Sequence, residues 1–150
     1  MKKRLFHLLL PVWILILELL PYGAVCIYAT PGATCRSTHS YFDLIPFGYA
    51  NFAPLITAVL TCVILVLLLV YAVTGKPGWG AVARFLLPIS TVISLGPLVY
   101  GIRFYSFIGG LITLCLAAES ILLYLAAREP AAEVAAAAEV AADEASDRAE

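Results

Sequence analysis

Charged residues are scarce in this chain of 150 residues, where they make up 13% of the sequence. An average soluble domain has about a quarter of its residues charged and about half apolar. Here 63% of the residues are hydrophobic and the mean hydropathy is +0.98. This balance excludes an ordinary water-soluble domain and predicts a membrane protein.

Sequence motifs of the common enzyme classes are also missing. The chain has no G-x-S-x-G, no P-loop, no H-E-x-x-H and no glycine-rich dinucleotide fingerprint. Its four cysteines include no C-x-x-C, so neither a zinc site nor a thiol oxidoreductase site is indicated. His7 and His39 lie far apart in the sequence and are interpreted as solvated side chains. We therefore expect no enzymatic activity, no metal and no cofactor.

The few charges are divided unevenly along the chain. Residues 129–150 hold seven acids and only Arg148, which leaves eight basic residues and three acids in the remainder. No dense stripe of Lys and Arg is present, so nucleic acid is not an expected partner. The tail repeats AAEVAA twice, a composition typical of a solvated extension that is partly helical or disordered. An acidic contact for a basic cytoplasmic partner is the alternative interpretation of this tail.

Four apolar segments are long enough to cross a bilayer core of about 30 Å as helices. Because the intervening stretches contain turn residues, we predict an all-α membrane protein with four transmembrane helices in a compact bundle over residues 1–128, followed by an acidic Ala/Glu-rich tail over 129–150. The predicted spans are about 5–28, 52–73, 79–100 and 104–127, with a long outer loop over 29–51.

The orientation of these spans follows from the basic residues near their ends. Six fall on one side and two on the other, which predicts cytoplasmic N- and C-termini in a bacterial cell membrane: Lys2, Lys3, Arg4, Lys76, Arg84 and Arg128 against Arg36 and Arg103. The first segment also has the charged start and apolar stretch of a secretory signal, whose cleavage would leave three spans. Its length, the acid within it and the lack of an A-x-A site favour a retained helix.

Two acids fall inside predicted spans, where an unpaired charge is expensive. Pro21 frees the carbonyl of Leu17, so we expect a kinked first helix in which a protonated Glu18 donates to a nearby freed carbonyl, either within its own helix or across to another. Proton or cation handling and an intersubunit contact are the alternatives for Glu18. For Glu119, Arg84 lies at a similar depth in the preceding span, which predicts an ion pair.

Small residues and cysteines complete the pattern. Small side chains at helical spacing in the last three spans predict closely packed helices. Cys26 and Cys35 fall on the outer side, so a disulfide between them is a possible pairing, whereas Cys62 and Cys115 are expected to pack as apolar groups. The aromatic segment 40–52 predicts a cap at the outer interface, with a partner-binding surface as the alternative.

Together these patterns favour a small multi-pass protein that acts as a non-enzymatic accessory or structural component of a membrane assembly. Its expected partners are membrane lipids and either another membrane protein or further copies of the chain. The alternative is a small oligomeric proton-coupled transporter that uses the carboxylate of Glu18, with Glu119 or Arg84 in support.

Overall fold

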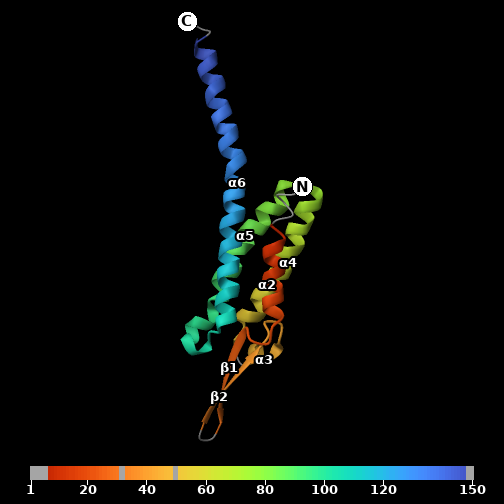
Figure 1. The fold of residues 1–150 in the computed structure, drawn as a ribbon, viewed down its shortest axis with the longest axis vertical. Helices are drawn as coiled ribbons and strands as arrows, with labels where there is room; N and C mark the ends of the chain where they lie inside the picture. The colour runs from red at the N-terminus through yellow and green to blue at the C-terminus, as the bar shows by residue number, and fades with distance from the viewer. Residues whose placement is uncertain (1–6, 31–32, 49–50, 148–150) are drawn as a thin grey trace. The chain divides into compact units, whose positions relative to one another are not determined.

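The computed structural model describes residues 7–30, 33–48 and 51–147, and the side chains of residues 7–28, 34–47 and 51–128. The described chain is mainly helical, with one two-stranded antiparallel sheet (Figure 1). It forms two compact units, residues 1–120 and 121–150. The elements in chain order are α2 (Leu9–Leu19), β1 (Ala24–Thr30), β2 (Ala33–His39), α3 (Leu44–Gly48), α4 (Ala53–Thr74), α5 (Pro77–Ser94), the 3₁₀ helices η1 (Gly96–Tyr100) and η2 (Ile102–Phe104), and α6 (Phe107–Asp147).

Three helical segments are long and apolar enough to cross a membrane: Ala53–Thr74, Pro77–Tyr100 and Phe107–Arg128. The 22 residues of α4 alone extend about 33 Å, which matches a bilayer core. These segments confirm the prediction of a helical protein with long apolar helices in its last three predicted spans.

The first predicted span, 5–28, is wrong at its C-terminal end. Helix α2 stops at Leu19, and its 11 residues extend only about 16 Å. Leu20 adopts an extended conformation, as expected of a residue that precedes a proline. Pro21 therefore ends the helix instead of kinking it. The next apolar residues form β1, because valine, isoleucine and tyrosine suit a strand.

Strands β1 and β2 form a hairpin that takes in the end of the first predicted span, 5–28, and the start of the predicted outer loop, 29–51. Their register runs from Ala24 opposite His39 to Thr30 opposite Ala33. The base of β1 is buried, and the amide of Asn51 donates to the carbonyl of Val25 at 3.5 Å. We call the end of the bundle from which this hairpin projects the hairpin end (Figure 1).

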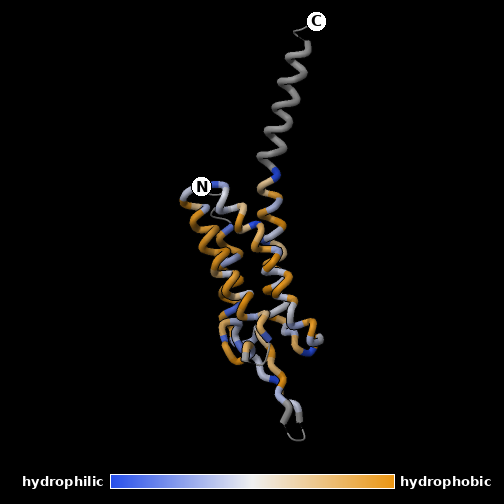
Figure 2. Tube along the Cα trace, turned by 180° about the vertical axis from the view of Figure 1, so that it is seen from behind, coloured by the Kyte–Doolittle hydropathy of each residue, from blue (hydrophilic) through white to orange (hydrophobic). Residues whose placement is uncertain are grey.

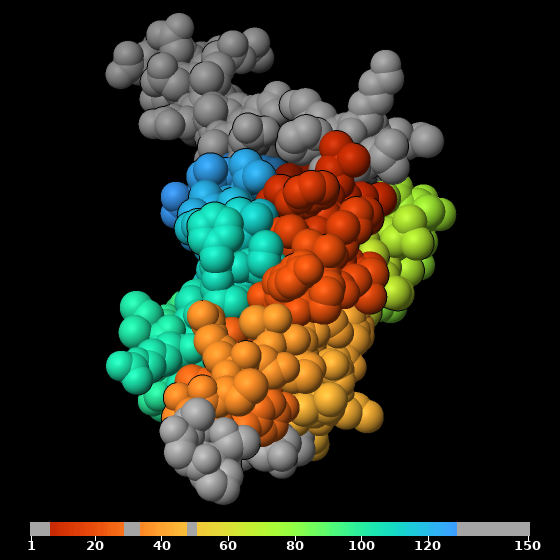
Figure 3. Space-filling view, turned by 60° about the horizontal axis from the view of Figure 1, so that its bottom comes forward, coloured from red at the N-terminus to blue at the C-terminus, as the bar shows by residue number. Residues whose placement is uncertain are grey.

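Helix α2 lies between α4 and α6 in two views of the first unit (Figures 1 and 3). The face of α4 that turns inward carries the small residues expected there: Pro54, Thr57, Ala58 and Thr61 are all buried. Close approach is also evident where Gly96 meets α4, because an added Cβ would lie 2.6 Å from the Cβ of Ala53. Small side chains thus let these helices pack closely, as predicted.

The described helices before the tail are largely apolar along their length (Figure 2). Large hydrophobic side chains on α4 and α5, such as Val66, Phe85 and Val92, are exposed. A surface of this kind is typical of a helix that faces lipid.

The second unit is the continuation of α6 from Ile121. Its described side chains include exposed Ile121, Leu122 and Leu125, and the guanidinium of Arg128 lies 5.1 Å from the ring centroid of Tyr124. The helix continues to Asp147, whereas the side chains of the predicted tail, 129–150, lie outside the described part.

Candidate polar site in the helix bundle

Glu18 is fully buried, with 0% of its surface exposed, and is one of two buried acids among the described side chains. Its Oε1 lies 2.8 Å from the hydroxyl of Thr61 on α4. That hydroxyl also lies 3.0 Å from the carbonyl of Thr57. A threonine carries one hydroxyl hydrogen and can donate to only one of these oxygens. Both contacts are satisfied if Glu18 is protonated and donates to Thr61, which in turn donates to Thr57.

The remaining oxygen of Glu18 supports the neutral form of the carboxyl group. Oε2 is buried and has no hydrogen-bond partner among the described residues. A neutral carbonyl oxygen left unpaired costs far less than an ionised carboxylate in the same place. The carbonyl of Leu17 accepts the N–H of Leu20 at 3.2 Å, and the side-chain contact of Glu18 is the hydroxyl of Thr61 instead of a carbonyl freed by Pro21. The partner of Glu18 is on another helix.

Tyr41 closes the end of α2 next to Glu18. Its backbone N–H donates to the carbonyl of Glu18 at 2.9 Å, and its side chain is almost fully buried. The ring lies directly against Gly23, where an added Cβ would be 2.8 Å from the ring. Burial raises the pKa of the Tyr41 phenol well above its usual range. Tyr41 thus fills the space that the short helix α2 leaves at the hairpin end.

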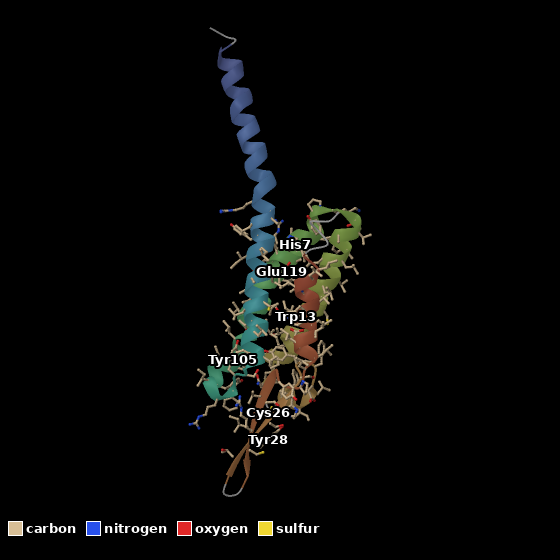
Figure 4. The ribbon with its side chains drawn as sticks, viewed as in Figure 1. His7, Trp13, Cys26, Tyr28, Tyr105 and Glu119 are labelled. Atoms are coloured by element: carbon tan, nitrogen blue, oxygen red, sulfur yellow. The ribbon has the colours of Figure 1, made fainter. Side chains whose placement is uncertain are left out.

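Glu119 is the second buried acid, with 1% of its surface exposed. Its Oε1 lies 3.2 Å from Nδ1 of His7, at the opposite end of the bundle from the hairpin (Figure 4). The predicted ion pair with Arg84 is wrong, since among the described residues Glu119 pairs with His7. The interpretation of His7 as a solvated group is also wrong, because α2 lies beside α6 and brings the imidazole to Glu119.

A chain of hydroxyl groups connects α5 with the start of α6. The Tyr105 hydroxyl lies 2.6 Å from that of Thr113, which lies 2.7 Å from that of Ser94. Ser94 is also 2.9 Å from the carbonyl of Thr91. If each hydroxyl donates to the next group in this order, all three hydrogens are used. These groups therefore link two neighbouring helices.

Ser106 gives α6 a defined beginning. Its hydroxyl accepts the N–H of Gly109 at 2.8 Å, the geometry of a helix N-cap, and donates to the carbonyl of Gly23. The chain that leaves α2 is thus attached to the start of α6.

A smaller polar group lies at the hairpin end. Nδ1 of His39 is 3.1 Å from Asp43, and Nε2 is 3.4 Å from the hydroxyl of Tyr28. Since Asp43 also accepts the N–H of Ile45 at 3.4 Å, His39 joins the end of β2 to the start of α3. The interpretation of His39 as simply solvated missed this i, i+4 pair.

Cys26 and Cys35 are both free cysteines in the structure. The register places Cys26 opposite Ser37 and Cys35 opposite Tyr28, so the two cysteines are diagonal neighbours. Diagonal side chains on adjacent strands are about 7–8 Å apart, beyond the Cβ separation of about 4 Å that a disulfide needs. This register disfavours the possible pairing.

The sequence did not identify the partners of the two buried acids. Thr61 stood out only as one of the small residues at helical spacing, and His7 only as a polar residue near the N-terminus. The described residues hold no group of three or more His, Cys, Asp or Glu side chains that could bind a metal ion.

Comparison with known proteins gives no match: no family model, no curated protein and no solved structure is similar to this chain.

Proposed function

We propose that the chain is a small multi-pass protein of the cell membrane, without enzymatic activity of its own, that serves as an accessory or structural component of a larger membrane assembly. The observation that supports this most is the use of its buried polar groups. Glu18 contacts Thr61 and Glu119 contacts His7, so both acids join one element to another. In lipid, polar contacts of this kind hold helices together.

The proposal includes an orientation with both termini in the cytoplasm. The distribution of basic residues in the sequence supports it, because six of the eight that precede the tail fall on the side predicted to be cytoplasmic. The acidic tail would then be available to cytoplasmic partners.

A crosslinking experiment in native membranes tests the accessory role. A photoreactive benzoylphenylalanine is placed in turn at Val66 on α4, Phe85 on α5 and Val92 on α5, all of which are exposed. We expect one face to crosslink to a single defined protein and the other faces to crosslink only to lipid. Crosslinks to lipid alone, or only to a second copy of the chain, at every position would refute the accessory role.

A proton-coupled transporter is the second candidate function, and one observation favours it. Oε2 of Glu18 is buried without a partner among the described residues, so the carboxyl group has an unused acceptor. Proton flux into vesicles that contain the purified protein and a pH-sensitive dye tests this candidate. If Glu18 carries the proton, Glu18→Gln abolishes the flux and the matched Glu119→Gln variant retains it. Equal flux in wild type and Glu18→Gln would exclude this role.

A further inference from the structure

The connection between α5 and α6 exposes an unusual amount of apolar surface. Val99, Ile102 and Phe107 have 83–87% of their surface exposed, more than any other large hydrophobic residue in the described part of the chain. All three lie within residues 96–107, which include η1, η2, the residues that connect them to each other and to α6, and the first residue of α6. We call this segment the ledge.

Glycine gives the ledge its shape. Gly101 lies between η1 and η2 with a φ of +113°, a conformation that other residues adopt only with strain. The chain bends at this glycine, and the two short helices on either side of it contact each other. The rings of Tyr100 and Phe104 lie across this bend, with centroids 6.1 Å apart. The bend is thus a formed structure that holds its apolar side chains outward.

Positive charge accompanies this apolar surface. Arg103 is exposed within η2 itself. Arg36 on β2 is also exposed, and its guanidinium donates to the carbonyl of Tyr105 at 3.4 Å, directly after η2. The acid at the hairpin end, Asp43, contacts His39 instead of either arginine. Exposed aliphatic and aromatic groups with arginines beside them match the boundary between acyl chains and phosphates in a bilayer.

The ledge is continuous with surfaces that already suit lipid. Val92 and Leu95 are exposed at the end of α5, and Leu114 is exposed near the start of α6. The hydropathy changes at this end, because the helices are apolar and much of the hairpin is more polar (Figure 2). The ledge therefore lies at the level where an apolar surface gives way to a polar one.

We propose that the ledge docks on the phospholipid headgroups of one leaflet, with Val99, Ile102 and Phe107 among the upper acyl chains and Arg36 and Arg103 at the phosphates. It thereby fixes how deeply the bundle lies, and the hairpin stands in water beyond it. The ligand is a phospholipid with an anionic headgroup preferred. This inference rests on the membrane insertion contained in the proposed function.

Fluorescence quenching by brominated lipids tests the docking. Trp13→Phe and Trp79→Phe remove the native indoles, both of which are exposed, and Ile102→Trp supplies the reporter. The full chain is reconstituted into phosphatidylcholine vesicles with bromine near the headgroup or near the chain end. We expect blue-shifted emission that shallow bromine quenches more strongly than deep bromine. Thr38→Trp on exposed β2, in the same background, is the matched control and stays red-shifted and unquenched.

Each other result overturns the proposal. Red-shifted, unquenched emission at position 102 would place the ledge in water, and blue-shifted but unquenched emission would mean that protein covers it. Membrane insertion is measured separately by quenching of Trp13 and Trp79 in the wild type. If those indoles are not quenched either, insertion itself fails; if they are quenched, only the ledge proposal does.

A charge variant tests the phosphate contact with the same reporter. Brominated phosphatidylglycerol, diluted into plain phosphatidylcholine, should quench position 102 more than equally diluted brominated phosphatidylcholine. Arg103→Gln should reduce this preference by up to about fivefold, the effect of one basic residue near an anionic surface. Lys76→Gln, at the connection between α4 and α5, is the control and should leave it unchanged. An unchanged preference in Arg103→Gln would overturn the assignment of an anionic headgroup.

Discussion

The contact between Glu18 and Thr61 should contribute measurably to stability, and Thr61→Val is the change that tests it. Valine has the shape of threonine without the hydroxyl group. The variant removes the group 2.8 Å from Oε1, so both oxygens of a fully buried carboxyl group would lack a partner. An unsatisfied buried polar group costs about 1–3 kcal/mol. Measured hydrogen bonds between membrane helices are weaker, about 0.6 kcal/mol on average and at most about 2. We therefore expect Thr61→Val to lower the free energy of unfolding by about 1–2 kcal/mol.

Glu18→Gln should behave differently, because an amide N–H can donate to Thr61 just as a protonated carboxyl group does. We expect it to change the unfolding free energy by less than about 1 kcal/mol. Glu18→Leu removes the polar group altogether, so the added cost of Thr61→Val should largely disappear in that background.

Unfolding in mixed micelles with increasing dodecyl sulfate gives these free energies. The result that would refute the reasoning is a Thr61→Val variant within about 0.5 kcal/mol of wild type, with additive effects in the double variant. A Glu18→Gln variant that is several kcal/mol more stable than wild type at neutral pH would refute the neutral carboxyl group instead, because it would mean that an uncompensated charge had been removed.

Two further predictions concern the hairpin end. Gly23→Ala should lower the free energy of unfolding by about 1–3 kcal/mol, because its Cβ would lie 2.8 Å from the Tyr41 ring. The control is Gly78→Ala, whose Cβ would have nothing within 4 Å and which should be neutral or stabilising by up to about 1 kcal/mol. Thermal unfolding in detergent compares the two variants, and equal losses of stability would contradict the close packing of Gly23 against Tyr41. Exposed Cys35 should react with a maleimide in the folded protein, whereas burial raises the pKa of the Cys26 thiol and slows its reaction at neutral pH. Because folding raises the pKa of the Cys26 thiol, the protonated thiol contributes stability below the ordinary thiol pKa, and this contribution is lost as pH rises above it. Cys26 should therefore become reactive in alkaline solution. Equal maleimide rates for Cys26 and Cys35 at neutral pH would be inconsistent with the burial of Cys26.

The long helices α4, α5 and α6 could be predicted from the sequence, because a helix that crosses a bilayer needs an apolar segment of a defined length. The predicted span 52–73 differs by one residue at each end from α4, which is Ala53–Thr74. Packing faces could also be predicted in part, since Thr57 and Thr61 fall at helical spacing and are buried together. The partners of Glu18 and Glu119 could not, because they depend on which helices are neighbours. The sequence predicts a similar depth for Arg84 and Glu119, but the position of α2 brings His7 to Glu119 instead.

The end of the first helix could not be predicted from hydropathy. A buried apolar segment has the same mean hydropathy whether it forms a helix or a strand. Pro21 disturbs a helix in either case, and the residues after this proline decide between a kink and an end. Residues 24–30 have strand-forming composition, and two residues connect them to 33–39, which is polar enough to pair outside the bundle. A helix to Tyr28 would have left that second strand without a partner. The hairpin was therefore encoded in the pairing of two segments, and a search for spans that examines each segment alone cannot detect it.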